Sequence, residues 1–123
     1  MARILIVEDE PHLLRVMSMW LARNGHEVLE SSDGIEALEV LDRERVDLIV
    51  SDVNMPHLDG IELMRTVREE RALEIPCVLL SARCDHARLQ DAIKTFNVQL
   101  YPKPFSPSRL VAQISHLLDT PVA

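Results

Sequence analysis

Short apolar runs alternate with longer segments of helical periodicity along the whole chain. The first run, residues 3–7, reads Arg-Ile-Leu-Ile-Val and is almost continuously apolar, which is typical of a central strand buried on both faces. The next segment starts at Pro11, a residue type favoured in the first turn of a helix, and stops near Gly25. A helix is therefore predicted over 11–24, with its apolar residues at helical spacing (Leu13, Met17, Trp20 and Leu21).

The same alternation repeats four more times. Further strands are predicted at 27–30, 47–51, 76–80 and 99–101. The stripes that predict the helices after them are Ile35-Leu38-Leu41, Ile61-Met64-Val67, Leu89-Ile93-Phe96 and Leu110-Ile114-Leu117. Five strand–helix pairs predict an α/β domain in which βαβ units build a parallel sheet. Because the chain shows no repeat, low-complexity segment or internal linker, we expect one domain over 1–119, a frayed tail over 120–123 and no output domain after the last helix.

The composition indicates an ordinary globular domain. The 123 residues are 47% hydrophobic and 27% charged, which excludes a disordered or fibrous chain. A net charge of −7 argues against a phosphate backbone as partner, so direct nucleic-acid binding is not expected. Cys77 and Cys84 form neither a CxxC pair nor a Cys/His cluster, so zinc and redox sites have little support. No apolar run approaches the ~20 residues of a membrane span and no signal peptide precedes the first strand, so a cytoplasmic protein without membrane contact is expected.

Polar side chains stand where four of the predicted strands end. Glu8 and Asp9 follow the first strand, Asp52 the third, Ser81 the fourth and Lys103 the fifth. Each has an ordinary explanation by itself, as a turn residue, a helix cap or a solvated charge. The carboxyl ends of parallel strands share one edge, however, so these residues are expected to converge there. Three crowded carboxylates would repel one another unless a hard divalent cation neutralised them, which makes Mg²⁺ the natural candidate.

The segments around these residues resemble a known family, the receiver domains of two-component response regulators. Residues 4–10 (Ile-Leu-Ile-Val-Glu-Asp-Glu) are similar to the family's opening strand and acidic pair. Residues 51–60 contain an Asp-x-x-Met-Pro-x-x-Asp-Gly pattern similar to its phosphoacceptor segment, and Ser81-Ala82 and Lys103-Pro104-Phe105 complete the likeness. The resemblance spans essentially the whole chain. It implies a doubly wound, flavodoxin-like fold, with a five-stranded parallel sheet of order 2-1-3-4-5 flanked by five helices.

The resemblance also implies a role for each residue of the edge. Asp52 would be the nucleophile that forms an acyl phosphate. Mg²⁺ would be held by Asp9, Asp52, the main-chain carbonyl of Asn54 and, through water, Glu8. Lys103 would contact a phosphate oxygen, and Ser81 would donate a hydrogen bond to the phosphoryl group and draw its loop inward. The Lys103–Pro104 bond is expected to be cis.

Other positions would modulate the switch. Ala82 follows the switch serine, and Arg83 together with Asn54 would flank the path of the hydrolytic water. Leu100 stands where the family usually has Tyr or Phe, so an aromatic switch is in question, and strand alternation points Tyr101 to the opposite face. Phe96-Asn97 replaces a small pair at the end of the fourth helix, where we expect Phe96 to pack in the core.

The function implied is that of a phosphoacceptor in a two-component phosphorelay, which catalyses only its own phosphorylation and dephosphorylation. Expected partners are a histidine kinase or phosphotransfer protein and a downstream effector, with the chain a monomer or weak dimer. A haloacid dehalogenase-type phosphatase is disfavoured because its second Asp is Asn54 here. A flavin site is disfavoured because the three glycines offer no phosphate-cradling loop. A degenerate receiver that acts as a constitutive interaction module stays open as an alternative.

Overall fold

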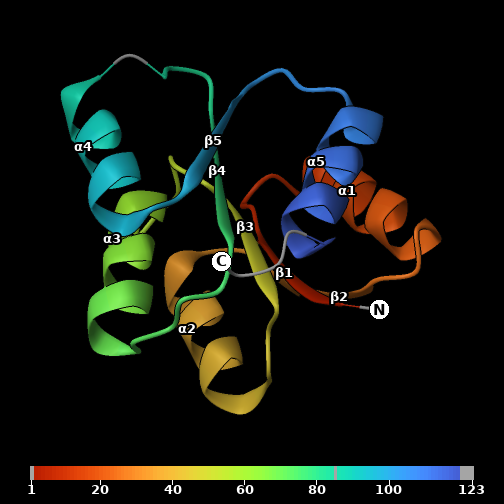
Figure 1. Cartoon of the computed structure of the whole chain (residues 1–123), viewed down its shortest axis with the longest axis horizontal. Coiled ribbons are helices and arrows are strands. Elements are labelled where there is room, and N and C mark those ends of the chain that lie inside the picture. Colours follow the sequence, from red (N-terminus) through yellow and green to blue (C-terminus); the bar gives the residue numbers. More distant parts are fainter. Residues whose placement is uncertain (1, 85, 120–123) are drawn as a thin grey trace.

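The computed structural model describes residues 2–84 and 86–119, which form a five-stranded parallel sheet of order β2-β1-β3-β4-β5 with helices on both faces (Figure 1). The strands are β1 (Arg3–Val7), β2 (Glu27–Ser31), β3 (Leu48–Asp52), β4 (Cys77–Ser81) and β5 (Gln99–Pro102). The helices are α1 (Pro11–Arg23), α2 (Gly34–Arg43), α3 (Gly60–Arg65) with its continuation η1 (Thr66–Glu70), α4 (Ala87–Phe96) and α5 (Pro107–Asp119). The predicted α/β class, strand order and five helices are confirmed, whereas the predicted tail 120–123 lies outside the described residues.

Two hydrophobic cores lie on the two faces of the sheet. Leu5 and Val7 of β1 pack with residues of α2, α3 and α4, while Ile4 and Ile6 pack with residues of α1 and α5. All four side chains are fully buried. The apolar run of β1 is therefore continuous because both of its faces are covered, as is usual for a central strand of a parallel sheet.

Strands β3 and β4 begin and end one residue later than predicted, and β2 and β5 each end one residue later. Asp52 and Ser81 are the last residues of their strands instead of the first residues after them, and Asp52 pairs with Leu80 in the ladder. The polar side chains end the apolar pattern, but the backbone pairing continues, because it depends on main-chain groups and not on the side chain.

The helix predicted from the Ile61-Met64-Val67 stripe changes its hydrogen-bonding pattern before it ends. Residues Thr66–Glu70 form a π-helix, in which the Arg71 N–H donates to the Thr66 carbonyl at 2.9 Å. The extra residue in this turn was not visible in the apolar spacing.

The ends of two helices agree with their residues. Pro11 opens α1, and Gly25 just after it adopts φ +87°, a conformation that glycine tolerates without strain. Asn97 ends α4 in the left-handed region, and Phe96 before it packs partly buried against the core beside α3, as predicted. Among the described helices, none is long and apolar enough to cross a membrane.

Candidate functional site

Three carboxylates meet at the carboxyl edge of the sheet. Glu8 and Asp9 directly follow β1, and Asp52 ends the neighbouring strand β3. One oxygen from each lies within 4.8 Å of the other two. Glu8 is 1% exposed and Asp52 7% exposed, whereas Asp9 is open to solvent. The predicted acidic cluster therefore forms, with two buried members and one at the surface.

Lys103 joins this cluster from the connection between β5 and α5. Its Nζ lies 3.1 Å from Asp52 Oδ1 and 3.2 Å from Glu8 Oε1. The lysine side chain is 23% exposed, so its cation is close to solvent but contacts both buried carboxylates. The peptide bond from Lys103 to Pro104 is cis, as expected.

The pKa shifts at the site follow from burial and from the single cation. Burial raises the pKa of the Asp52 carboxyl, although its hydrogen bond and charge pairing with Lys103 act in the opposite direction. Burial and the nearby Asp52 charge raise the pKa of Glu8. Burial by itself lowers the pKa of Lys103, but the hydrogen bond to Asp52 and the charges of Asp52 and Glu8 raise it overall. Two buried carboxylates therefore share one lysine beside a third carboxylate, that of Asp9, and a divalent cation with a preference for oxygen ligands fits this donor set.

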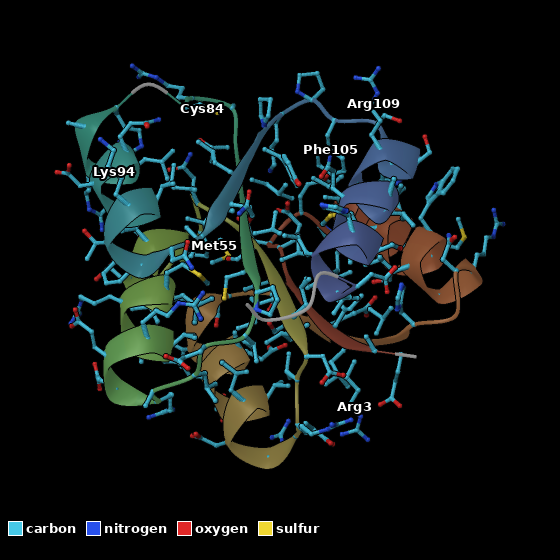
Figure 2. All side chains as sticks on the ribbon, in the orientation of Figure 1. Arg3, Met55, Cys84, Lys94, Phe105 and Arg109 are labelled. Atoms are coloured by element: carbon cyan, nitrogen blue, oxygen red, sulfur yellow. The ribbon has the colours of Figure 1, made fainter. Side chains whose placement is uncertain are left out.

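Ser81, the last residue of β4, is hydrogen-bonded to the loop that follows it. Its Oγ donates to the Arg83 carbonyl at 2.7 Å and accepts from the Arg83 N–H at 3.1 Å. Ser81 is 1% exposed, whereas Ala82 and Arg83 are exposed. In Figure 2, Cys84 of this loop and Phe105 of the β5–α5 connection lie at the same end of the molecule, opposite Arg3. The structure thus places Ser81 at the predicted edge with its hydroxyl already paired.

The loop after Asp52 contains a close approach that sequence analysis did not single out. The Gly60 N–H donates to the Val53 carbonyl at 2.8 Å, and a Cβ on Gly60 would lie 2.3 Å from the Asp52 carbonyl oxygen. Only glycine fits there. The Asp-Gly pair at positions 59 and 60 was the feature of the sequence that could have indicated this close contact. Asn54, at the start of the loop, is exposed.

Glu10 is a second residue that was missed. Its carboxylate accepts from the N–H groups of His12 and Leu13, both at 3.2 Å, and so caps α1. The acidic residue following Glu8 and Asp9 is therefore used by the helix and does not belong to the three-carboxylate cluster.

Leu100 and Tyr101 of β5 face opposite cores, as strand alternation predicts. Leu100 packs partly buried beside α3 and α4, and Tyr101 packs on the face of α1 and α5. The Tyr101 hydroxyl donates to Gln113 Oε1 at 3.0 Å. No aromatic ring occupies position 100, and the ring at 101 lies on the other face of the sheet.

Comparisons with known proteins agree with this geometry. The family model of the response regulator receiver domain matches residues 4–115. The alkaline phosphatase synthesis transcriptional regulatory protein PhoP of Bacillus subtilis is 34% identical over 116 residues, which cover 94% of this chain and 48% of that protein. A chemotaxis protein CheY homolog of Campylobacter jejuni is 32% identical over 121 residues, which cover 96% of this chain and 93% of that protein.

Comparison with a solved structure also indicates a response regulator. The chemotaxis response regulator CheY4 of Vibrio cholerae superposes with a TM-score of 0.85 at 30% identity, covering 95% of this chain and 98% of that one. The chain spans about half the length of PhoP and of several other curated regulators that it matches. A family match over residues 4–115, supported by this fold, shows that the chain belongs to the response regulator receiver domain family of two-component signalling.

Proposed function

We propose that this domain accepts a phosphoryl group on Asp52 from a histidine kinase or phosphotransfer protein, in an Mg²⁺-dependent reaction, and thereby changes the surface it offers to an effector. The observation that carries the proposal is the convergence of Glu8, Asp9, Asp52 and Lys103, with the Asp52 carboxylate buried between acids and one cation. A carboxylate in this setting is a nucleophile that a cation can bring close to a phosphoryl group.

The proposed reaction transfers a phosphoryl group directly from the donor histidine to Asp52 and needs no other reactant. A carboxylate oxygen of Asp52 attacks phosphorus and forms a P–O bond, while the P–N bond to the donor histidine breaks and the departing imidazole takes up a proton. Glu8, Asp9, Asp52 and the Asn54 carbonyl would hold Mg²⁺. The bound ion would reduce the repulsion between Asp52 and the phosphoryl oxygens.

Lys103 and Ser81 would both exchange partners when the phosphoryl group arrives. The Lys103 Nζ now contacts two carboxylates and would shift to a phosphoryl oxygen. The Ser81 hydroxyl would leave the Arg83 carbonyl and donate to another phosphoryl oxygen. Because Ser81 Oγ also holds the Arg83 N–H, this exchange would move the loop through Ala82 and Arg83.

Several residues would tune the lifetime and the output of this state. Arg83 and Asn54 are exposed beside the site, where they would flank the approach of the hydrolytic water. Leu100 and Pro104 lie near the end of the sheet where the signal would leave the site. The domain proposed over 1–119 would act in the cytoplasm as a monomer or weak dimer, with a protein effector and no direct contact with nucleic acid or membrane, in keeping with its net charge of −7.

Phosphorylation with a small donor tests the proposal. Incubation with acetyl phosphate and Mg²⁺ should add one hydroxylamine-labile phosphoryl group, measured by mass spectrometry of the intact chain. Asp52→Asn should abolish the addition, while Asp91→Asn, an exposed aspartate of α4, should leave it unchanged. Equal labelling of Asp52→Asn would contradict the assignment of the phosphoacceptor.

A constitutive interaction module is the second candidate, favoured by one observation, the leucine at position 100 in place of an aromatic ring. It predicts no uptake of phosphoryl groups by the wild-type chain in the same assay. Incorporation that requires both Mg²⁺ and Asp52 would exclude it.

A further inference from the structure

Helices α3 and α4 lie side by side on one face of the sheet (Figure 1). An ion pair joins their N-terminal ends. Asp59 caps α3, since its Oδ1 accepts from the Glu62 N–H at 2.8 Å. The same carboxylate accepts from Arg88 in the first turn of α4, through Nη1 to Oδ2 at 2.9 Å and through Nη2 to Oδ1 at 3.4 Å. One carboxylate therefore joins the start of α3 to the start of α4.

Asp59 is in turn tied to the main chain of the proposed phosphoacceptor. The residue after it, Gly60, donates to the Val53 carbonyl at 2.8 Å and packs against the Asp52 carbonyl without room for a Cβ. A shift of the main chain at Asp52 would therefore be passed to Gly60 and Asp59, because closely packed backbone groups leave little space to absorb it.

The opposite end of α4 is held more firmly. Arg68 of η1 donates to the carbonyls of Phe96 at 2.7 Å and Asn97 at 3.3 Å, which are the last carbonyls of the helix and its cap. It also donates at 2.8 Å to the carbonyls of Leu73 and Ile75 in the segment before β4. A cation at the C-terminus of a helix is stabilising, and Arg68 gives this end of α4 two hydrogen bonds while two more anchor the arginine to the segment before β4.

The N-terminal end of α4 has weaker restraints. Arg88 is 56% exposed and Asp59 24% exposed at their side chains, so solvent and salt weaken their attraction. The helix is otherwise held there by His86, whose Nδ1 accepts a main-chain N–H at 3.1 Å, and by Gln90, whose side-chain amide donates to a carbonyl of the preceding loop. The N-terminal end of α4, which follows the loop after Ser81, is therefore the end of the helix that a movement of that loop would displace.

We propose that the Asp59–Arg88 ion pair is a latch that holds the start of α4 against the phosphoacceptor loop and so favours the unphosphorylated state. The inference rests on the proposed function, because it assumes that Ser81 releases the Arg83 carbonyl when a phosphoryl group is bound. The two-point geometry of the pair tolerates little relative movement, so a shift of α4 away from Asp59 costs the attraction. Removal of the pair then makes the shift easier and phosphoryl binding tighter.

Binding of beryllofluoride, a phosphoryl mimic, in saturating Mg²⁺ measures this coupling. By isothermal titration calorimetry, Arg88→Gln should bind the mimic about 1.5- to 5-fold more tightly than wild type, the range expected for loss of one exposed ion pair. Asp59→Asn keeps a capping side chain and should produce the same gain. The double variant should add nothing further, because each single change already removes the pair. Raising the ionic strength should bring the ratio of the two affinities toward one, because screening weakens the ion pair that only wild type has.

Two control variants separate the latch from general charge and stability effects. Arg65→Gln removes an exposed arginine that lines the same groove between α3 and α4, and it should leave the affinity unchanged. Arg71→Gln removes an ion pair of the same kind, to Asp42 of α2, at the far end of η1, and it too should leave the affinity unchanged.

Each outcome of the titration bears on the latch. Equal affinities for wild type and Arg88→Gln would refute the latch and leave the proposed function intact. A gain in Asp59→Asn alone would assign the effect to the helix cap and would also refute the latch. Absence of binding to wild type would overturn both the latch and the proposed function.

Discussion

Replacing Lys103 with methionine should destabilise the fold, because it leaves the carboxylates of the acidic cluster to repel one another without a counter-ion. The lysine Nζ lies 3.1 Å from Asp52 and 3.2 Å from Glu8, and no other side-chain cation pairs with either carboxylate among the described residues. Methionine keeps much of the aliphatic length but removes the charge. Two buried carboxylates then face each other and the exposed Asp9 without a counter-ion.

The magnitude follows from the geometry. At an effective dielectric constant of ~20, each contact of about 3 Å carries a gross attraction of about 5 kcal/mol. Desolvation of the three groups offsets most of this attraction, and Lys103 retains 23% exposure. We therefore expect the free energy of unfolding to fall by about 3 kcal/mol, the lower end of the cost of breaking a buried ion pair. For a domain of this size the loss corresponds to about 10 °C in Tm.

The loss should depend on pH with a defined sign. Lys103 lowers the pKa of both Asp52 and Glu8, so the variant's carboxyls have pKa values raised further above their unfolded values. A carboxyl whose folded pKa is raised takes up a proton on folding, so the variant loses stability relative to wild type as the pH rises through that folded pKa. The difference between the two proteins should be small at about pH 5 and larger at about pH 7.5.

Urea denaturation of both proteins without Mg²⁺ at these two pH values would measure the difference. Lys94→Met is the matched control, because Lys94 is exposed on α4 (Figure 2) and should contribute little. Added Mg²⁺ should reduce the deficit of Lys103→Met, since a divalent cation can replace the missing charge. A deficit that does not change with pH, or that is no larger than the effect of Lys94→Met, would refute this account of the site.

Three further changes test other parts of the site. Asp9→Asn should leave the free energy of unfolding without Mg²⁺ nearly unchanged, because Asp9 is exposed. If the substitution weakens Mg²⁺ affinity tenfold, it removes about 1.4 kcal/mol of the stabilisation at saturating Mg²⁺. Thermal melts in which Mg²⁺ raises the Tm of the variant as much as that of wild type would count against Asp9 as a ligand. Gly60→Ala should lower the free energy of unfolding by about 3 kcal/mol, because its Cβ would meet the Asp52 carbonyl. Gly25→Ala is the control, because a Cβ there has open space and should cost only the strain of the positive φ, about 1 kcal/mol. Similar losses for the two variants in urea denaturation would show that the backbone moves to make room for the Cβ at position 60. Beryllofluoride should protect the loops after β3 and β4 from hydrogen exchange and change β5 little, because Leu100 has no ring to move; a large change centred on Leu100 would contradict this expectation.

The fold was largely predictable because its strands are buried on both faces. Continuous apolar runs in the central strands and helical stripes between them require a covered parallel sheet, so local patterns were sufficient to predict the elements. The polar residues that end those runs were equally visible, and Glu8, Asp9, Asp52 and Lys103 do meet at one edge. Strands β2, β3, β4 and β5 each end one residue later than predicted, because backbone pairing continues past the residue at which the side-chain pattern stops.

The resemblance to receiver domains added what spacing could not provide. The strand order and the cis bond before Pro104 are properties of the folded family, and both are present. The order of strands depends on which crossovers pack together, and no single segment of the chain records it.

Tertiary structure alone decided how the side chains at the site are paired. The sequence by itself determined where carboxylates, a hydroxyl and a lysine stand along the chain, because strand ends interrupt an apolar pattern. It did not determine that Ser81 hydrogen-bonds Arg83, that Arg68 binds the end of α4, or that Asp59 pairs with Arg88. The last two contacts join residues 28 and 29 positions apart, on elements whose relative placement is set by the packing of whole helices. Local periodicity reports how much of each segment is buried, whereas the partner of a polar group depends on which segments the completed core brings together.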